Sequence, residues 1–190
     1  MVIGVITNSD NRTASILTSL GVRVGPLHYG EEERPEQSLG DGSGDFDVDF
    51  TVLSYDVGAE KPDGKIFEAA EEMLRILLRR EDAVGLPASD ADAADADASA
   101  EAWSKVYVGD EYEKDVVGAT RAGWKAVLVE REDAAGAGRG DREGVEWLGG
   151  KRPAAAATKP LSIFDVFSRT NAVGVGSLKE LGEWIPSPRD

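Results

Sequence analysis

The sequence contains no cysteine and only one histidine, His28, among its 190 residues. The absence of cysteine excludes disulfides and thiolate metal sites, and it leaves the redox compartment open. His28 lies in a stretch that we expect to be a loop, without the serine or cysteine partner pattern of a catalytic triad. A triad hydrolase is therefore not expected.

Long hydrophobic runs are also missing. The N-terminal stretch "MVIGVITNSD" is apolar, but it lacks the basic residues of a signal peptide and is too short to span a membrane. We therefore expect a protein without a membrane partner, located in the cytoplasm, with the nucleus left open.

Basic residues are scarce, because 21 Lys and Arg stand against 36 Asp and Glu, a formal net charge of −15. Such a surface repels phosphate groups, so neither nucleic acid nor an anionic membrane is an expected partner. The charge is compatible with divalent cations or basic partners. The length suffices for one domain with a hydrophobic core.

Short β-branched runs alternate along the chain with amphipathic patterns. Buried strands are expected at residues 2–7, from residue 50, at 106–108, at 126–129 and after residue 171. Because strands that alternate with helices form parallel sheets, the expected fold is α/β, a Rossmann-like parallel sheet with helices on both faces.

Helices are expected after the first three of these strands. The first is capped by Ser9 or Asp10 and ends at Gly21. The second covers residues 61–80, and the third covers 114–122. The apolar positions of the first two recur at helical spacing: Ile16, Leu17 and Leu20 in the first, and Ile66, Phe67, Ala70, Met73, Leu74 and Leu77 in the second.

Composition divides the chain into a core and insertions. Residues 1–130 are expected to form a partial core that contains an acidic, Gly-rich loop at 30–49 and a disordered Ala/Asp insertion at 82–102. Residues 131–170 are expected to be a linker or insertion with one ordered turn at "SIFDVF". Residues 171–190 would add a last strand and a closing helix.

Polar side chains that could take part in binding or catalysis follow the ends of the expected strands. Thr7 and Asn8 follow the first strand, Lys61 lies in the loop after the second, and Asp110 follows the third. Ligands of parallel sheets bind at the carboxyl ends of the strands. Thr7, with the backbone amides of Asn8 and Ser9 at a predicted helix N-terminus, could bind phosphoryl oxygens, so Thr7, Asn8 and Lys61 are the candidate phosphate-binding residues. Asp110 and Asp115 offer the oxygen ligands that Mg²⁺ prefers, so the set suggests metal-assisted phosphoryl transfer.

Three stretches resemble motifs of the haloacid dehalogenase-like (HAD) hydrolases, and most closely the branch called haloacid dehalogenase-like hydrolase domain-containing protein 3. "VIGVITNSDNR" resembles the second motif of the family, which ends in Thr or Ser. "FTVLSYDVGAEKPDGKIFEAA" resembles the third, with its Lys-Pro. "VYVGDEYEKDVVGATRAGWKAVLV" resembles the fourth. The resemblance covers about half of the chain, in the family's order.

This resemblance implies a Rossmann-like core, Mg²⁺ and an aspartate nucleophile that forms a covalent aspartyl-phosphate. Thr7 and Lys61 would be the catalytic residues: Thr7 would bind the phosphoryl group of a small phosphorylated metabolite, and Lys61 would steady the nucleophile and the phosphate. Asp110 and Asp115 would hold the metal. Trp124 is expected to pack a helix against the sheet, as its family counterpart does.

The first motif of the family, a strand ending in Asp-x-Asp, has no counterpart before Thr7. In the family that strand lies between those equivalent to residues 2–7 and 106–108, so we expect an incomplete, truncated core of two half-sheets with exposed edges. The cap domain is missing as well. No nucleophile is then present in the chain, Mg²⁺ binding would be weak or absent, and we expect no appreciable turnover unless a partner protein supplies the strand.

Two other functions are compatible with the same residues. The chain could be a degenerate, non-catalytic domain that serves as an interaction module. A receiver-type phospho-acceptor domain is disfavoured, because its acidic pair would have to precede the Thr and Lys strands.

Asp47-x-Asp49-x-Thr51 matches the first motif literally, but a polar loop precedes it, so a charged strand entry is expected. Asp10 is expected to cap a helix rather than to act as a substitute nucleophile.

Overall fold

The structure is a computed structural model that describes residues 1–30, 46–82, 103–130, 142–148 and 162–185. The chain forms two compact units, unit 1 (Met1–Trp103) and unit 2 (Ser104–Asp190), and each is described by itself. Most of the acidic loop and of the two predicted insertions lies outside the described residues.

Unit 1 contains a three-stranded parallel sheet in the order β1-β3-β2. Its strands are β1 (Gly4–Thr7), β2 (Val24–His28) and β3 (Val48–Leu53). The central strand β3 is the most buried, as expected for a strand with neighbours on both sides. Thr7 lies opposite Leu53, so β1 and β3 end at the same level.

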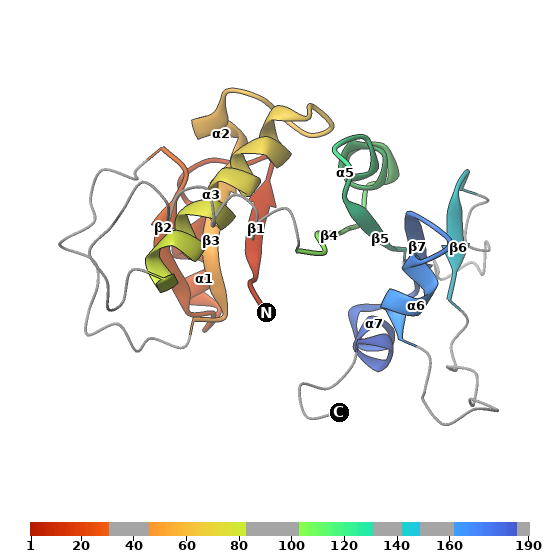
Figure 1. The fold of residues 1–190 in the computed structure, drawn as a ribbon. Coiled ribbons are helices and arrows are strands. Elements are labelled where there is room, and N and C mark those ends of the chain that lie inside the picture. Colours follow the sequence, from red (N-terminus) through yellow and green to blue (C-terminus); the bar gives the residue numbers. More distant parts are fainter. Residues whose placement is uncertain (31–45, 83–102, 131–141, 149–161, 186–190) are drawn as a thin grey trace. The chain divides into compact units, whose positions relative to one another are not determined.

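One helix supplies most of the core of unit 1. Helix α3 (Lys65–Asp82) packs against β3 and β1, and Figure 1 shows it lying over one face of the sheet. The predicted apolar face is confirmed except at one position, where Leu78 is buried and Leu77 only partly so. The short helix α2 (Ser54–Val57) follows β3 directly and ends at Gly58, whose φ of +69° favours glycine.

The first helix differs from its prediction at the start. Helix α1 (Thr13–Ser19) begins after Arg12, and neither Ser9 nor Asp10 caps it, because the Asp10 carboxylate accepts hydrogen bonds from the backbone and side chain of Arg12 instead. The helix end at Gly21 is confirmed, with φ of +86° and the paired closing hydrogen bonds of a Schellman motif.

The predicted apolar face of α1 does not become a buried face. No residue of α1 is buried, and Ile16 and Leu20 are 54% and 74% exposed. The spacing correctly predicted a helix, but within the described residues of unit 1 this face has no covering layer.

Strand β2 was not predicted, and His28 ends this strand rather than lying in a loop. Gly25 and Pro26 interrupt the apolar pattern there, although both fit an edge strand. A Cβ at Gly25 would lie 2.8 Å from the carbonyl oxygen of Asp49, so only glycine allows the strands to approach at this point. Pro26 is exposed, and the pairing is irregular between Val24 and Leu27.

Unit 2 contains a four-stranded parallel sheet in the order β4-β5-β7-β6. Its strands are β4 (Val106–Gly109), β5 (Lys125–Val129), β6 (Val145–Trp147) and β7 (Ala172–Val175). The fourth strand, β6, was not predicted and falls in the segment expected to be linker. It pairs with β7, whose Gly174 leaves room for the Trp147 ring where any other side chain would overlap it.

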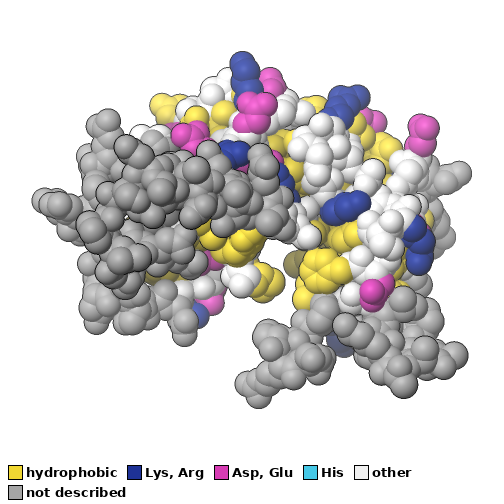
Figure 2. Space-filling view, viewed as in Figure 1, with side chains coloured by type: hydrophobic (Ala, Val, Ile, Leu, Met, Phe, Trp, Pro, Cys, Tyr) yellow, Lys and Arg dark blue, Asp and Glu magenta, His cyan; other side chains and the backbone are white. Residues whose placement is uncertain are grey.

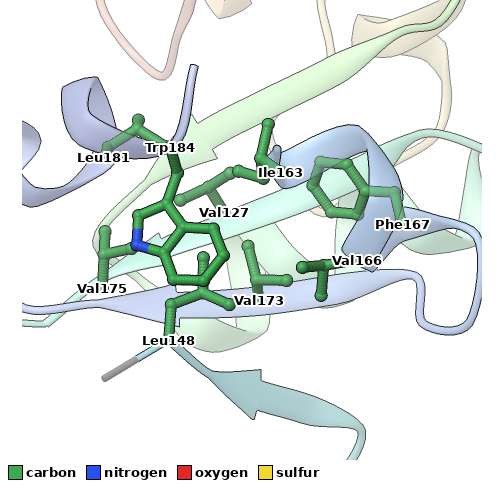
Figure 3. Close-up of a cluster of buried hydrophobic side chains, with 9 residues drawn as sticks. All are labelled: Val127, Leu148, Ile163, Val166, Phe167, Val173, Val175, Leu181 and Trp184. Carbon is green, nitrogen blue, oxygen red and sulfur yellow. The ribbon is translucent and has the colours of Figure 1, made fainter. Parts of the chain in front are cut away.

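The core of unit 2 joins the sheet to its last two helices, α6 (Ile163–Phe167) and α7 (Leu178–Trp184). Figure 3 shows the Trp184 ring of α7 beside Val127, Leu148 and Val175. Trp124 is also buried, and Lys105 lies 6.0 Å from its ring centroid. Together the units confirm the predicted α/β class, with parallel strands flanked by helices.

Strands β1 and β4 are outer strands of their sheets. In the described part of the chain, β1 pairs with β3 alone and β4 pairs with β5 alone. The expectation that residues 2–7 and 106–108 would each border an open sheet edge is confirmed. Ile3 and Val108, beside or within these strands, are 42% and 40% exposed.

The described surface carries mixed charge. Figure 2 shows acidic and basic side chains interspersed on the face drawn, with hydrophobic side chains also reaching the surface. None of the helices in the described ranges is both long and apolar enough to cross a membrane.

The exposed pair of Asp47 and Arg23 gives unit 1 a pH-dependent contact. Hydrogen bonds from the Arg23 side chain, and then from its backbone, lower the pKa of Asp47 to about 2. Because the folded-state pKa is depressed, this contribution to stability is present above about pH 4 and is lost between about pH 4 and 2. Melting curves should show the difference between wild type and Asp47→Asn shrinking over that window. Arg23→Ala should behave as Asp47→Asn does, and a difference that is as large at pH 2 as at pH 5 would contradict this assignment.

Candidate functional site

The end of β1 is joined to the Lys61 loop by one side chain. The Asn8 Oδ1 atom accepts a hydrogen bond from the Lys61 backbone N–H at 2.8 Å, and Asn8 Nδ2 donates to the Lys61 carbonyl oxygen at 3.2 Å. All three of Thr7, Asn8 and Lys61 are half-buried. The structure therefore brings together the predicted phosphate-binding residues of unit 1.

The turn after β1 is held by further contacts. The Ser9 carbonyl oxygen accepts from the Tyr55 N–H at 3.3 Å and from the Ser54 hydroxyl at 3.4 Å. Because α1 starts only at Thr13, the amides of Asn8 and Ser9 do not lie at a helix N-terminus. The predicted contribution of a helix dipole to anion binding at this turn was therefore wrong.

The loop after β4 is organised by a buried carboxylate. Asp115 is 3% exposed, and its Oδ2 atom accepts hydrogen bonds from the backbone N–H groups of Asp110 at 3.0 Å and Glu111 at 2.9 Å. A Cβ at Gly109 would overlap the Asp115 carboxylate. Gly109 is thus required for the close approach that shapes the loop, while the Asp110 side chain is exposed beyond it.

The residues of this loop fit Mg²⁺ in part. Magnesium is usually held by one or two carboxylates together with water and substrate phosphate, which suits Asp110 with Asp115. However, Asp115 Oδ2 is engaged by backbone N–H groups. No group of three or more His, Cys, Asp or Glu able to hold a metal occurs among the residues that the structure describes. The Asp110 carboxylate is thus exposed, whereas the Asp115 carboxylate is engaged by the backbone of its own loop.

The loop after β4 makes a second tertiary contact, which the sequence did not predict. The π-helical turn η1 (Tyr112–Val117) and helix α5 (Gly118–Arg121) replace the single helix predicted at 114–122. The Tyr112 hydroxyl donates to the Glu143 carbonyl at 2.8 Å, and the Arg142 guanidinium lies 5.6 Å from the Tyr112 ring centroid. Arg142 also pairs with Glu130, which follows β5. The segment before β6 is thus attached to the loop that carries Asp110.

The literal Asp-x-Asp match lies at the wrong end of its strand for catalysis. Asp47 pairs with Arg23, and Asp49 accepts a hydrogen bond from the Ile3 backbone N–H. Both residues lie at the amino end of β3, whereas Leu53 ends that strand beside Thr7. The contacts favour the charged strand entry that the polar context predicted.

His28 has a hydroxyl partner that the sequence did not suggest. Its Nδ1 atom lies 2.6 Å from Thr51 Oγ1, and its Nε2 atom lies 3.1 Å from Asp56 Oδ2. The order of groups is that of a triad, but Thr51 is only 3% exposed, so its hydroxyl is not accessible to a substrate. The contacts join β2 to β3 and α2, which is a structural role.

Parallel strands, flanking helices and polar groups at the strand ends define an α/β protein of Rossmann-like type. Residues 59–143 match a family model described as HAD-hydrolase-like, a segment that contains Lys61, Asp110 and Asp115 but not Thr7. Over this segment, which is less than half of the chain, the sequence is similar to the HAD-like hydrolases. No curated protein matches the chain.

A solved structure of a HAD phosphatase from Thermococcus onnurineus is similar to this chain, at 19% identity and a TM-score of 0.46. The similarity covers 96% of this chain and 49% of that one, so this chain spans about half the length of the solved structure.

Proposed function

We propose that the chain is part of a HAD-like phosphohydrolase that acts on a small phosphorylated metabolite. The observation that carries this proposal is the family match over the segment with Lys61, Asp110 and Asp115, together with the hydrogen-bonded contact of Lys61 to Asn8 after β1. The specific branch suggested by the motifs, and a location in the cytoplasm, are part of the same proposal.

The two units carry different candidate residues. In unit 1 the Thr7 hydroxyl donates a hydrogen bond to a phosphoryl oxygen, and the Lys61 ammonium offsets negative charge that develops during transfer. In unit 2 Asp110 would hold Mg²⁺, with Asp115 orienting its loop. When bound, Mg²⁺ would neutralise phosphoryl oxygens and so favour attack on phosphorus.

The nucleophile is proposed to come from outside the 190 residues. Among the described strands, β1 and β4 each pair on one side only, so each can accept the backbone of a further parallel strand, and an exposed strand edge tends to pair with another segment. A strand that ends in Asp-x-Asp, from a longer form of the protein or from a partner chain, would supply the attacking carboxylate, and by pairing with β1 it would cover Ile3.

Phosphatase assays on two forms of the protein test this proposal. The purified 190-residue chain, with Mg²⁺ and a panel of phosphate esters, is expected to show no turnover above a protein-free blank. A form that also carries an upstream Asp-x-Asp strand is expected to hydrolyse at least one ester with a kcat in the usual enzyme range, about 1 s⁻¹ or more. Turnover by the 190-residue chain that is lost in Asp110→Ala would contradict the external nucleophile.

A second candidate, a non-catalytic interaction module, is favoured by the exposed apolar face of α1. Ile16 and Leu20 are one helical turn apart and largely exposed, as expected of residues that contact a partner. If the form with the upstream strand remains inactive on every ester although it is folded, this second function replaces the first.

A further inference from the structure

We propose that Asn8 is a positioning residue that sets the place of Lys61, rather than a residue that binds phosphate through its own side chain. This inference rests on the proposed function, because it assigns a role within the same phosphoryl site. The sequence-based expectation assigned phosphate binding to the backbone amide of Asn8 and gave its side chain no role.

The two hydrogen bonds of Asn8 involve both backbone groups of one residue. Asn8 Oδ1 accepts from the Lys61 N–H at 2.8 Å, and Asn8 Nδ2 donates to the Lys61 carbonyl at 3.2 Å. A primary amide carries an acceptor and a donor side by side, so it can bind both groups at once. Such a pair restrains the position and the rotation of the Lys61 backbone, which a single hydrogen bond does not.

The Lys61 loop needs an external restraint of this kind. It connects Gly58, at the end of α2, to Lys65, at the start of α3, and it lies in neither helix. A turn hydrogen bond from the Asp63 N–H to the Glu60 carbonyl shapes the loop internally. Asn8, 53 positions away in the sequence, fastens the loop to the end of β1.

The chemistry of the site gives this restraint a purpose. Thr7 precedes Asn8 and is hydrogen-bonded into the sheet opposite Leu53, so its backbone position is determined by the strand. Because Asn8 is the next residue, its bonds to Lys61 transmit that position to the lysine. The Asn8 amide therefore helps to set the position of the Lys61 backbone relative to Thr7, and small errors in such positions are costly in catalysis.

Other residue types at position 8 do not reproduce the contact. Aspartate retains an acceptor for the Lys61 N–H but lacks the donor for its carbonyl, and alanine lacks both. Serine is too short to span both groups, and glutamine adds a methylene that displaces its amide. Asn8→Asp is thus a partial variant and Asn8→Ala a complete one.

Hydrogen exchange of the Lys61 amide tests the contact in the full 190-residue chain. Asn8→Ala is expected to raise the exchange rate of this amide about tenfold, and Asn8→Asp to raise it less, because its carboxylate still accepts from the N–H. Ser54→Ala removes a hydrogen bond to Ser9 in the same turn and serves as the matched control. An unchanged Lys61 exchange rate in Asn8→Ala would overturn the proposal.

Binding of inorganic phosphate, followed by amide chemical shifts, tests the functional role. Asn8→Ala is expected to weaken phosphate binding about fivefold in the wild-type background and to have no effect when Lys61→Ala is already present. Equal losses in both backgrounds would show that Asn8 acts independently of Lys61 and would overturn its positioning role. If neither the 190-residue chain nor the form with the upstream strand shows phosphate-induced shifts, while Asn8→Ala still raises the exchange rate of the Lys61 amide, the proposed function fails and the hydrogen-bonded contact of Asn8 with Lys61 stands.

Discussion

Replacement of Asp115 by alanine is expected to lower the free energy of unfolding of unit 2 by about 3 kcal/mol, because it leaves two backbone donors without their acceptor. The Asp115 carboxylate is 3% exposed and accepts from the N–H groups of Asp110 and Glu111. Charge-assisted bonds of this kind are stronger than neutral ones. The loss of the carboxylate also opens a void beside Gly109, where water cannot restore both contacts in the original geometry.

Denaturation followed by tryptophan fluorescence measures this effect in unit 2, where Trp124 and Trp184 are buried. Asp165→Ala is the matched control, because the Asp165 carboxylate also accepts from a backbone N–H but belongs to an exposed helix cap. It is expected to cost about 1 kcal/mol. If Asp115→Ala costs no more than Asp165→Ala, the buried carboxylate does not organise the loop.

Replacement of Asp110 by asparagine is expected to act on rate rather than on stability. In a form of the protein that carries the nucleophile strand, kcat/KM should fall by about 10³, since a metal ligand at the transferring group is lost. The unfolding free energy should change by less than about 0.5 kcal/mol, because the Asp110 side chain is exposed. Replacement of Asp110 is thus expected to lower kcat/KM with little change in stability, whereas replacement of Asp115 is expected to lower stability.

Asp47→Asn is the control for this experiment. Asp47 belongs to the literal Asp-x-Asp match, but it lies at the amino end of β3 and pairs with Arg23. Its replacement should leave kcat/KM within about twofold of wild type, as for exposed residues remote from a site. A loss as large as that of Asp110→Asn would identify Asp47 as a catalytic residue and contradict the site described above.

Local pattern was sufficient to predict most of the elements but not two edge strands. The β-branched runs at β1, β3, β4, β5 and β7 were recognisable because each is long enough to bury apolar side chains. Strand β2 was missed because Gly25 and Pro26 interrupt it, and β6 because three residues carry little signal. Each of these strands is stabilised by pairing with a central strand that is distant in the sequence, so the local pattern does not reveal it.

In the candidate site, too, the residue types were predictable from the local sequence but the tertiary contacts were not. The residue types of Thr7, Lys61 and Asp110 at strand ends were sufficient to suggest phosphoryl chemistry. The use of the Asn8 amide on Lys61 depends on a contact across 53 positions, which spacing alone does not predict. The pairing of Tyr112 with the segment at Glu143 is likewise a tertiary contact. The Gly-Asp pattern at Gly109 was the one local signal for the close approach of Asp115.

The intact mass of the endogenous protein, with its N-terminal peptide identified by mass spectrometry, tests the external nucleophile most directly. We predict a product larger than 20.2 kDa, or a 20.2 kDa chain tightly bound to a partner, with an apolar strand ending in Asp-x-Asp in the added segment. A 20.2 kDa product that begins at Met1, has no strand-donating partner and hydrolyses phosphate esters in an Asp110-dependent manner would contradict the proposal.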